Sequence, residues 1–386
     1  MVETDIQAVT TKKQRKAAFH LPWQLYHDNP NWIPPLRQNQ MELLGFRKHP
    51  FYEHNEVQVF LATQGSKAVG RIAAITNLEH NRRYEDKVGF IGFFESIDDP
   101  DVANGLFDAA AGWLKERGLD TVRGPVNPSL NHEVGLLTDG FDTPPTFMMT
   151  YNHPYYPPLF EQAGFVKAQD LYAFDGHVNM LETLDTKLDF VIKEATRRFN
   201  IKMRPLDPRR FVEDLRLFLN IYNQSLGGTW GFTPLSEAEI DHVGKSLKHL
   251  IVPELTTICE VEGKPIAAVF GLLDFNPRIK LIDGRLFPFG FLRLLLNRRG
   301  IKRIRLLSTN VIPEYQRWGV GLVALSRLVP EVLKWGIEEA EFSWVLESNH
   351  LSFNTLKRGG AILSKSYRIY DRPIADETQD TAGAAS

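Results

Sequence analysis

The residues with the clearest chemical potential form a glycine-bearing run between positions 311 and 321. Within it, Gln316, Gly319 and Gly321 give the pattern Gln-x-x-Gly-x-Gly. The glycines let the backbone approach an anion closely, because no Cβ intrudes. A helix that begins directly after them points its free N–H groups and its dipole at the same place, which suits a phosphate. The run therefore predicts a phosphate-binding loop.

The segments around this loop must hold it in position. An apolar and basic strand-like segment at 304–307 precedes it, and a helical segment at 322–335 follows it. Three further elements come next: a β-prone run at 341–346, a helical stretch at 349–360 and a strand at 366–370. The expected order is therefore strand, loop, helix, strand, helix, strand.

This order, together with the glycine pattern, resembles the GNAT (GCN5-related N-acetyltransferase) acyltransferase superfamily. Asn349, Ser352, Arg358 and Gly360 add to the resemblance, because they stand where the family pattern has Asn, a small residue, a base and Gly. It implies that acyl-coenzyme A is a co-substrate, with no permanently bound cofactor and no metal. By resemblance, a strand edge would pair with the pantetheine and the loop N–H groups would take the pyrophosphate. The residues assigned to these roles are Asn310 and Val311 for the strand edge, and Gln316, Arg317, Trp318, Gly319, Val320 and Gly321 for the loop.

One position departs from the family pattern. Many members carry a Tyr that donates a proton to the departing thiolate, and this chain has Leu356 there. A non-catalytic module that binds acyl-coenzyme A therefore stays open beside an enzyme. The whole chain is similar to tandem GNAT proteins of the bacterial ceramide-synthase type, which implies transfer of a long acyl chain to a sphingoid-base amine.

Internal similarity predicts two copies of one plan. Residues 164–175 align with 360–371, and each follows a helix-like stretch. The hairpin expected at 57–76 is repeated at 257–273. We expect an α+β fold of two GNAT-like domains in tandem, each a mixed, mostly antiparallel twisted sheet flanked by helices. The expected bounds are 1–175, 176–372 and a disordered tail at 373–386.

The first copy lacks the phosphate-binding chemistry. Where the loop should be, it carries residues 98–103, with three carboxylates and Pro100. These carboxylates would repel a pyrophosphate, and the proline removes an N–H donor. Asp98 or Asp99 instead suits the N-cap of the following helix. The first domain is expected to have lost coenzyme binding, which the second domain keeps.

Acyl transfer to an amine needs a base, and the candidates are carboxylates near the expected cleft. Glu347 follows the fifth strand of the second copy and is the first candidate, with Glu133 at the corresponding exit of the first copy as the second. Asn349 is included with them because the family pattern has Asn there. His350 could also titrate near working pH, although a single His at a helix start is usually a surface residue.

Two stretches are candidates for the acceptor site. Asn127 and Asn131 lie in a polar loop after a strand, where they could face an acceptor or simply form turns and caps. Trp230 and Phe232 lie in a glycine-rich loop, where their rings could cover an acceptor pocket or fill the edge of the core.

A segment that begins at Phe287 and ends at Arg303 combines Phe and Leu with a run of basic residues. It is too short to span a bilayer, but it suits a helix that lies on an anionic membrane. A core helix, or a basic run that faces the coenzyme phosphates, would have the same composition. The segment favours a lipid amine as acceptor, with a small soluble amine acetylated from acetyl-coenzyme A as the alternative.

Composition excludes several classes. The 386 residues suggest two domains, and the net charge of -2 argues against nucleic-acid binding and against a transfer-RNA-dependent transferase. The single Cys259 excludes an internal disulfide and is expected to be a buried thiol. No signal peptide or long apolar segment is visible, so we expect a cytoplasmic protein that could contact the inner membrane peripherally. The sequence leaves open whether coenzyme A or an acyl carrier protein carries the acyl group.

Overall fold

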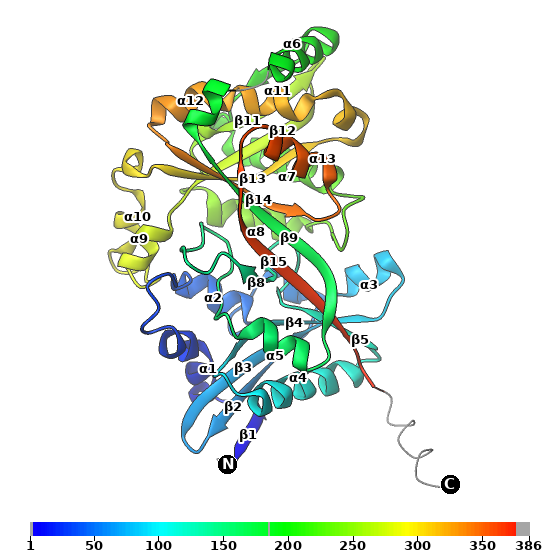
Figure 1. The fold of residues 1–386 in the computed structure, drawn as a ribbon, viewed down its shortest axis with the longest axis vertical. Helices are drawn as coiled ribbons and strands as arrows, with labels where there is room; N and C mark the ends of the chain where they lie inside the picture. Colours follow the sequence, from blue (N-terminus) through cyan, green and yellow to red (C-terminus); the bar gives the residue numbers. More distant parts are fainter. Residues whose placement is uncertain (1–2, 184–185, 376–386) are drawn as a thin grey trace.

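The chain folds around one large, continuous β-sheet. The computed structural model describes residues 3–183 and 186–375. Within them, the 13-stranded sheet has the order β1-β2-β3-β4-β5-β15-β9-β14-β13-β12-β11-β10, and β8 pairs with β15 beside this path (Figure 1). The strands are β1 (Thr4–Ala8), β2 (Val57–Gln64), β3 (Lys67–Ile75), β4 (Val88–Ser96), β5 (Thr121–Gly124), β6 (Val126–Asn127), β7 (Glu133–Val134), β8 (Leu136–Asp139), β9 (Val166–His177), β10 (Lys202–Arg204), β11 (Thr256–Val261), β12 (Lys264–Leu273), β13 (Arg303–Val311), β14 (Glu339–Leu346) and β15 (Ile362–Pro373). Strands β6 and β7 form a separate two-stranded sheet.

Helices flank this sheet along its length. They are α1 (Lys12–Leu25), α2 (Arg37–Leu43), α3 (Leu78–Tyr84), α4 (Pro100–Lys115), α5 (Tyr156–Gln162), α6 (Thr186–Phe199), α7 (Phe211–Ser225), α8 (Glu237–Leu247), α9 (Asn276–Leu281), α10 (Gly290–Leu295), α11 (Val320–Ser326), α12 (Leu328–Trp335) and α13 (His350–Arg358). No helix in the part of the chain that the structure describes is long and apolar enough to cross a membrane.

The two halves repeat the same arrangement. In the first half, β1 to β4 form antiparallel neighbours and β5 lies parallel to β4. In the second half, β10 to β13 form antiparallel neighbours and β14 lies parallel to β13. The expected α+β fold, with mixed and mostly antiparallel sheets flanked by helices, is therefore confirmed.

The last strands of the two halves are exchanged. β15, from the C-terminal end of the chain, pairs with β5 of the first half. β9, from the first half, pairs with β14 of the second half. The two exchanged strands also pair with each other and run side by side through the middle of the molecule (Figure 1). Because each half is completed by a strand of the other, the sheet has no break at the proposed boundary between residues 175 and 176.

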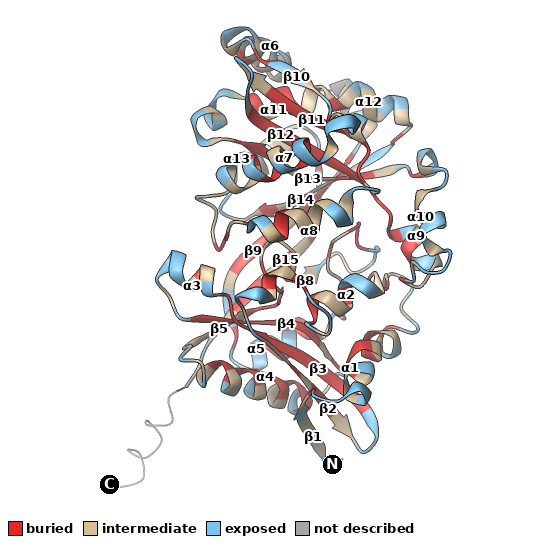
Figure 2. Cartoon of the chain, turned by 180° about the vertical axis from the view of Figure 1, so that it is seen from behind, coloured by how far each residue is buried: buried red, intermediate tan, exposed pale blue. Residues whose placement is uncertain are grey.

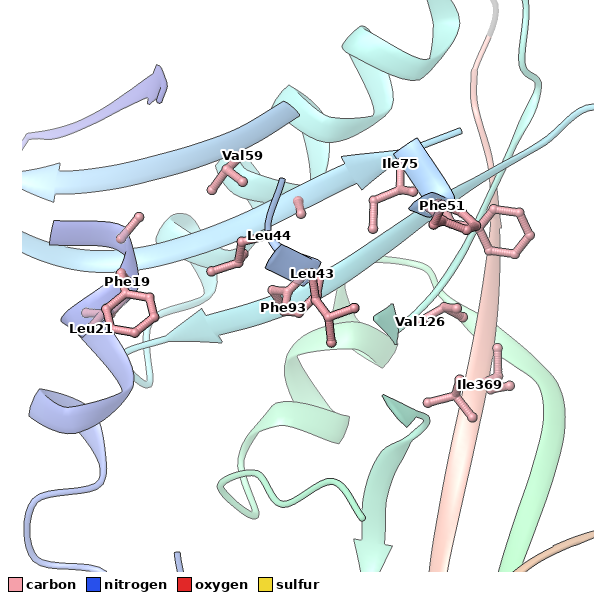
Figure 3. Close-up of a cluster of buried hydrophobic side chains, with 14 of the residues drawn as sticks. Phe19, Leu21, Leu43, Leu44, Phe51, Val59, Ile75, Phe93, Val126 and Ile369 are labelled. Atoms are coloured by element: carbon pink, nitrogen blue, oxygen red, sulfur yellow. The ribbon is translucent and has the colours of Figure 1, made fainter. Parts of the chain in front are cut away.

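The first-half core includes the exchanged strand. Phe19 and Leu21 of α1 and Leu43 of α2 pack over Phe93 of β4, and Ile369 of β15 belongs to the same cluster (Figure 3). Burying each such side chain contributes about 1.5–3 kcal/mol. The C-terminal strand is thus part of what stabilises the N-terminal half.

The start of α4 confirms the cap expected from the sequence. The Asp99 carboxylate accepts hydrogen bonds from the N–H groups of Asp101 (2.9 Å) and Val102 (3.4 Å), and Pro100 occupies the first turn. Along α4, Leu106 and Leu114 are buried on the face toward the sheet, while the opposite face is exposed (Figure 2). Cys259 is buried in β11, as expected.

Three expected elements have different bounds. The helix expected at 322–335 is divided into α11 and α12, because Pro330 cannot donate to the carbonyl of the preceding turn. In the segment from Phe287 to Arg303, only α10 is an α-helix. β15 runs through Pro373, and the Ile374 N–H bonds to the Asp120 carbonyl at 2.8 Å. The rest of the expected tail, residues 376–386, lies outside the described residues.

Candidate functional site

An open wedge lies between β13 and β14. The two strands pair only over residues 303–306 and 339–342, and then diverge. β13 nevertheless continues to pair with β12 as far as Val311. The opposite edge of residues 307–311 therefore has no strand partner in the described chain. A ligand with amide groups can pair with such an edge, as an added strand does.

The phosphate-binding loop predicted from the sequence follows β13 directly. A 3-10 turn, Pro313–Trp318, leads to Gly319, whose φ of 76° lies in the left-handed region, and α11 begins at the next residue. A Cβ at Gly319 would also lie 2.4 Å from the Val191 side chain of α6. A Cβ at Gly321 would lie 3.1 Å from the Thr309 side chain. The backbone path thus requires glycine at 319, where φ is positive, while at 321 a Cβ would only press on the Thr309 side chain.

Side chains hold this loop against its neighbours. The Gln316 amide donates to the Val311 carbonyl (3.0 Å) and to the Ser225 carbonyl (3.1 Å). Asn310 is buried, accepts from the Ser225 hydroxyl (3.0 Å) and donates to Ser308 (2.7 Å). These contacts fix the path of the chain from β13 into the loop.

Positive charge is available at the loop. Arg317 is exposed and forms no ion pair with a described residue. The Arg198 guanidinium of α6 lies 4.0 Å from the centre of the Trp318 ring, on the neighbouring surface. Glycines, two cations and the start of α11 together fit a diphosphate group.

The equivalent wedge of the first half is filled by the chain itself. β4 and β5 pair only over residues 88–90 and 121–123. Beyond that point the Asn127 side chain accepts a hydrogen bond from the Phe93 N–H at 2.7 Å. A Cβ at Gly92 would lie 2.1 Å from the Val126 carbonyl, so β6 rests directly on β4. The short strand β6 takes the position that is open in the second half.

A cavity of about 500 Å³ lies between the halves. Leu307 and Ser308 of β13 and Trp344 of β14 line it, all beyond the paired part of the second wedge. The Trp344 indole N–H is buried and has no hydrogen-bond partner in the described chain. The open wedge thus leads into the cavity.

Glu133 faces this cavity from β7. Its carboxylate forms no hydrogen bond or ion pair with the residues that the structure describes, and it lines the cavity wall. Burial raises the pKa of Glu133 to about 7, although the charge of Arg305 acts in the opposite direction. A carboxylate with a pKa near 7 can accept and return a proton at neutral pH.

Three histidines line another part of the same cavity. The His49 ring lies 5.5 Å from the His132 ring and 4.7 Å from the His242 ring. Burial, together with the neighbouring histidines, lowers the pKa of His132 to about 3 and that of His49 to about 4. These two imidazoles are therefore neutral at pH 7. The cluster is not predictable from the sequence, because its members are far apart in the chain and no local motif joins them.

The structure brings some predicted acceptor residues to the cavity and leaves others elsewhere. Asn127 and Asn131 line it, with Asn131 donating to the Thr233 carbonyl (2.9 Å) and accepting from the Tyr222 hydroxyl (2.9 Å). Trp230 packs under the Arg123 guanidinium at 4.8 Å, and Phe232 is buried against Tyr222. Neither ring is among the cavity-lining residues.

Glu347 and Asn349 lie away from the cavity. The Glu347 carboxylate pairs with Lys167 of β9 at 2.8 Å, in a partly exposed position. The Asn349 side chain caps α13 by accepting from the Ser352 N–H at 3.1 Å. Of the predicted catalytic residues, only Glu133 is brought to the cavity.

Comparison with known proteins identifies two relatives of nearly full length. Bacterial ceramide synthase of Caulobacter vibrioides (strain NA1000 / CB15N) is 35% identical over 378 residues, covering 95% of this chain and 96% of that protein. Protein YghO of Escherichia coli (strain K12) is 34% identical over 377 residues, covering 96% of this chain and 95% of that protein. No family model matches the chain.

Solved structures share the fold at low sequence identity. A tandem GNAT protein from the clavulanic acid biosynthesis pathway superposes with a TM-score of 0.56 at 8% identity, covering 97% of this chain and 99% of that one. A GCN5-related N-acetyltransferase from Sphaerobacter thermophilus gives a TM-score of 0.52 at 13% identity, covering 97% and 96%. At these identities the likeness extends to the fold alone.

Proposed function

The chain belongs to the tandem GNAT acyltransferases of the bacterial ceramide-synthase type, and from that membership we propose that it transfers a long acyl chain from acyl-coenzyme A to the amine of a lipid. The favoured acceptor is a sphingoid base or a similar long-chain amine. The relative in Caulobacter vibrioides is named a ceramide synthase, which motivates this acceptor.

The observation that carries the proposal is the open wedge that leads to a carboxylate. In this proposal the diphosphate of coenzyme A lies at Gln316 to Gly321, and the pantetheine pairs with the free edge of β13. The thioester then enters the cavity beside Ser308 and Trp344, which both line its wall. Because the first-half wedge is filled by β6, one coenzyme binds per chain, in the second half.

Glu133 is the proposed general base. The acceptor enters as the neutral amine. Its nitrogen attacks the thioester carbonyl carbon, and the Glu133 carboxylate takes one proton from that nitrogen. A C–N bond forms and the C–S bond breaks, so that coenzyme A leaves as a thiolate. The proton held by Glu133 can then pass to that thiolate, which supplies the acid that Leu356 cannot. A pKa of about 7 suits both directions of transfer.

The cavity wall favours long aliphatic groups. Apolar side chains from several elements line it, including Phe147, Leu215, Phe218, Leu219, Phe270 and Ile279. Each buried methylene contributes about 0.8 kcal/mol to binding. A small soluble amine and an acetyl group would leave most of this surface unused.

The segment from Phe287 to Arg303 is the proposed membrane contact. Phe287, Phe289 and Leu296 are each more than 60% exposed, and basic residues follow them in the chain. A peripheral position on a membrane would bring the enzyme to its lipid acceptor.

A matrix of donors and acceptors tests the proposal. Palmitoyl- and acetyl-coenzyme A, and a palmitoylated acyl carrier protein, are each offered with a long-chain 2-amino-1,3-diol and with a small polyamine. We expect amide formation from palmitoyl-coenzyme A and the long-chain amine, and at least tenfold less with the other pairs. Turnover of acetyl-coenzyme A with the polyamine alone would contradict the lipid acceptor. Binding of the thioester without any turnover would indicate a non-catalytic module.

A further inference from the structure

A second hollow, of about 570 Å³, lies on the surface of the first half. It is formed by the first turns of α1, by α2 and the chain after it, and by the segment that leads from Gly284 to Phe287. We call it the basic pocket, because its wall carries cationic side chains and no carboxylate. The cations are Lys12, Arg15, Lys16, Arg37, Arg47 and Arg285.

Most of this charge is not neutralised within the protein. Arg37 and Arg285 share Asp283 as an ion-pair partner. Lys12, Lys16 and Arg47 form no ion pair within residues 3–183 and 186–375, and neither does Arg15, which lies over the Phe46 ring at 5.8 Å. Like charges gathered in a hollow repel one another, and a bound anion removes that repulsion.

A neighbouring histidine reports the same positive field. His20 lines the basic pocket. Burial lowers the pKa of His20, and the charges of Arg37 and Lys16 lower it further. The cations around His20 thus disfavour its protonated form, as expected beside a group of unpaired positive charges.

An exposed apolar surface adjoins the pocket. Phe287 belongs to the pocket wall and is itself 73% exposed. Other large exposed side chains occur on or beside α9 and α10, which project from the body of the protein with solvent-exposed faces (Figure 2). We call these the apolar rim: Leu281, Phe287, Phe289, Phe291, Leu292 and Leu296. An apolar surface of this kind usually marks a binding site for a protein, a ligand or a membrane.

The basic pocket also adjoins the central cavity. Gln38 and Leu286 line both hollows. If the basic pocket contacted a membrane, the adjoining wall of the cavity would lie next to the lipids.

We propose that the basic pocket binds the phosphate group of an anionic membrane phospholipid while the apolar rim enters the interfacial layer of the bilayer. A soluble phosphate compound would use the cations but leave the rim exposed to water. A neutral lipid would cover the rim but leave the cations unpaired. An anionic phospholipid satisfies both features. The proposal deepens the proposed function, since it states where the enzyme meets a membrane that holds its lipid substrate.

Vesicle sedimentation with the full chain tests the site. We expect the protein to bind vesicles of phosphatidylglycerol and phosphatidylcholine about tenfold more tightly than vesicles of phosphatidylcholine alone. Lys16→Glu with Arg47→Glu should reduce binding to the anionic vesicles by about tenfold or more, because two exposed cations become anions. Phe287→Ser with Phe289→Ser should weaken binding to both kinds of vesicle.

A charge-matched control separates the effect of losing the pocket cations from the effect of changing the protein's net charge. Arg209→Glu with Lys264→Glu makes the same charge change at exposed positions outside the pocket and the rim, and should retain binding. Equal losses in the pocket pair and the control pair would overturn the proposal. So would binding of free glycerol phosphate, or of an acidic acyl carrier protein, at these residues without vesicle binding.

The readout does not depend on catalysis. A protein that binds the vesicles as described but transfers no palmitoyl group would contradict the proposed function and leave the lipid site standing. Transfer from palmitoyl-coenzyme A to a detergent-dispersed amine, with no vesicle binding, would contradict the lipid site alone.

Discussion

The two wedges of the molecule arise from the same arrangement of strands and differ in what fills them. In the first half, the Asn127 amide and the backbone of β6 occupy the space beside Phe93 and Gly92. In the second half, residues 307–311 keep a free edge toward the cavity. The loops differ as well, because the Asp99 carboxylate caps α4 while Gly319, which has no side chain, is the N-cap of α11. The first half thus forms a wall of the cavity, and the second half has the open wedge and the glycine loop that suit a coenzyme.

The difference also concerns the proposed base. Glu133 comes from the first half, on the β6–β7 pair that fills its wedge, where Asn127 pairs with it in register. The β6–β7 pair, which fills the first wedge, therefore supplies the carboxylate that lines the cavity at the open second wedge.

Replacing the base should have the largest effect. Glu133→Gln is expected to lower kcat/KM by about 10²–10⁴, since a positioned base contributes that much. Glu347→Gln serves as the control and should leave the rate within about twofold, because the side chain pairs with Lys167 outside the cavity.

The base acts when deprotonated, so wild-type kcat/KM should be high above pH 7 and fall as the pH drops below it. Steady-state kinetics from pH 5 to 9 measure both effects, and an active Glu133→Gln enzyme would reassign the base.

The same substitution should stabilise the protein. Folding raises the pKa of Glu133 from 4.5 to about 7, so folding favours its protonated form. The stability contributed by this group is fully present below pH 4.5 and is lost as the pH rises through about 7. At pH 8, Glu133→Gln should therefore increase the free energy of unfolding by about 2–3 kcal/mol. Urea unfolding at pH 5 and pH 8 measures the difference, and a destabilised variant at pH 8 would show that the carboxylate is compensated.

Adding one methyl group at the loop should weaken coenzyme binding. Gly319→Ala forces a positive φ on alanine and drives its Cβ toward Val191, so we expect at least about a tenfold higher Kd for coenzyme A. Gly263→Ala is the matched control, because Gly263 has the same φ of 76° with open space around it. It should cost stability, by about 1 kcal/mol, without changing affinity. Calorimetric titration compares the two, and equal affinities would remove the loop from the coenzyme site.

Loosening the filled wedge should cost stability without creating a second site. Asn127→Ala leaves the Phe93 N–H without its partner, which should lower the free energy of unfolding by about 1–3 kcal/mol. Because the backbone of β6 still rests on Gly92, the binding stoichiometry should stay at one coenzyme per chain. Two bound molecules in the variant would mean that a single amide keeps the first half closed.

Local features of the fold were predictable from the sequence. The glycine loop, the paired hairpins and the Asp99 cap all depend on residues close together in the chain. The exchange of β9 and β15 was not predictable in this way, because either strand could complete either half with similar apolar faces. Its outcome matters for the site, since β9 brings Lys167 to Glu347, while Glu133 is the predicted catalytic residue that lines the cavity.

The histidine cluster and the basic pocket also escaped prediction from the sequence. His49, His132 and His242 meet only in the folded chain, as do Lys16, Arg47 and Arg285. The sequence does show that the segment after Phe287 is rich in Phe and Leu. Their partner, a pocket built mainly from α1 and α2, required the tertiary structure.

A crystal structure of the chain with coenzyme A tests the central claim most directly. The account predicts one coenzyme, with its diphosphate at Gln316 to Gly321, its pantetheine along residues 307–311 and its sulfur in the cavity that Glu133 lines. Density for the coenzyme between β4 and β5, or at any site away from β13, would contradict it.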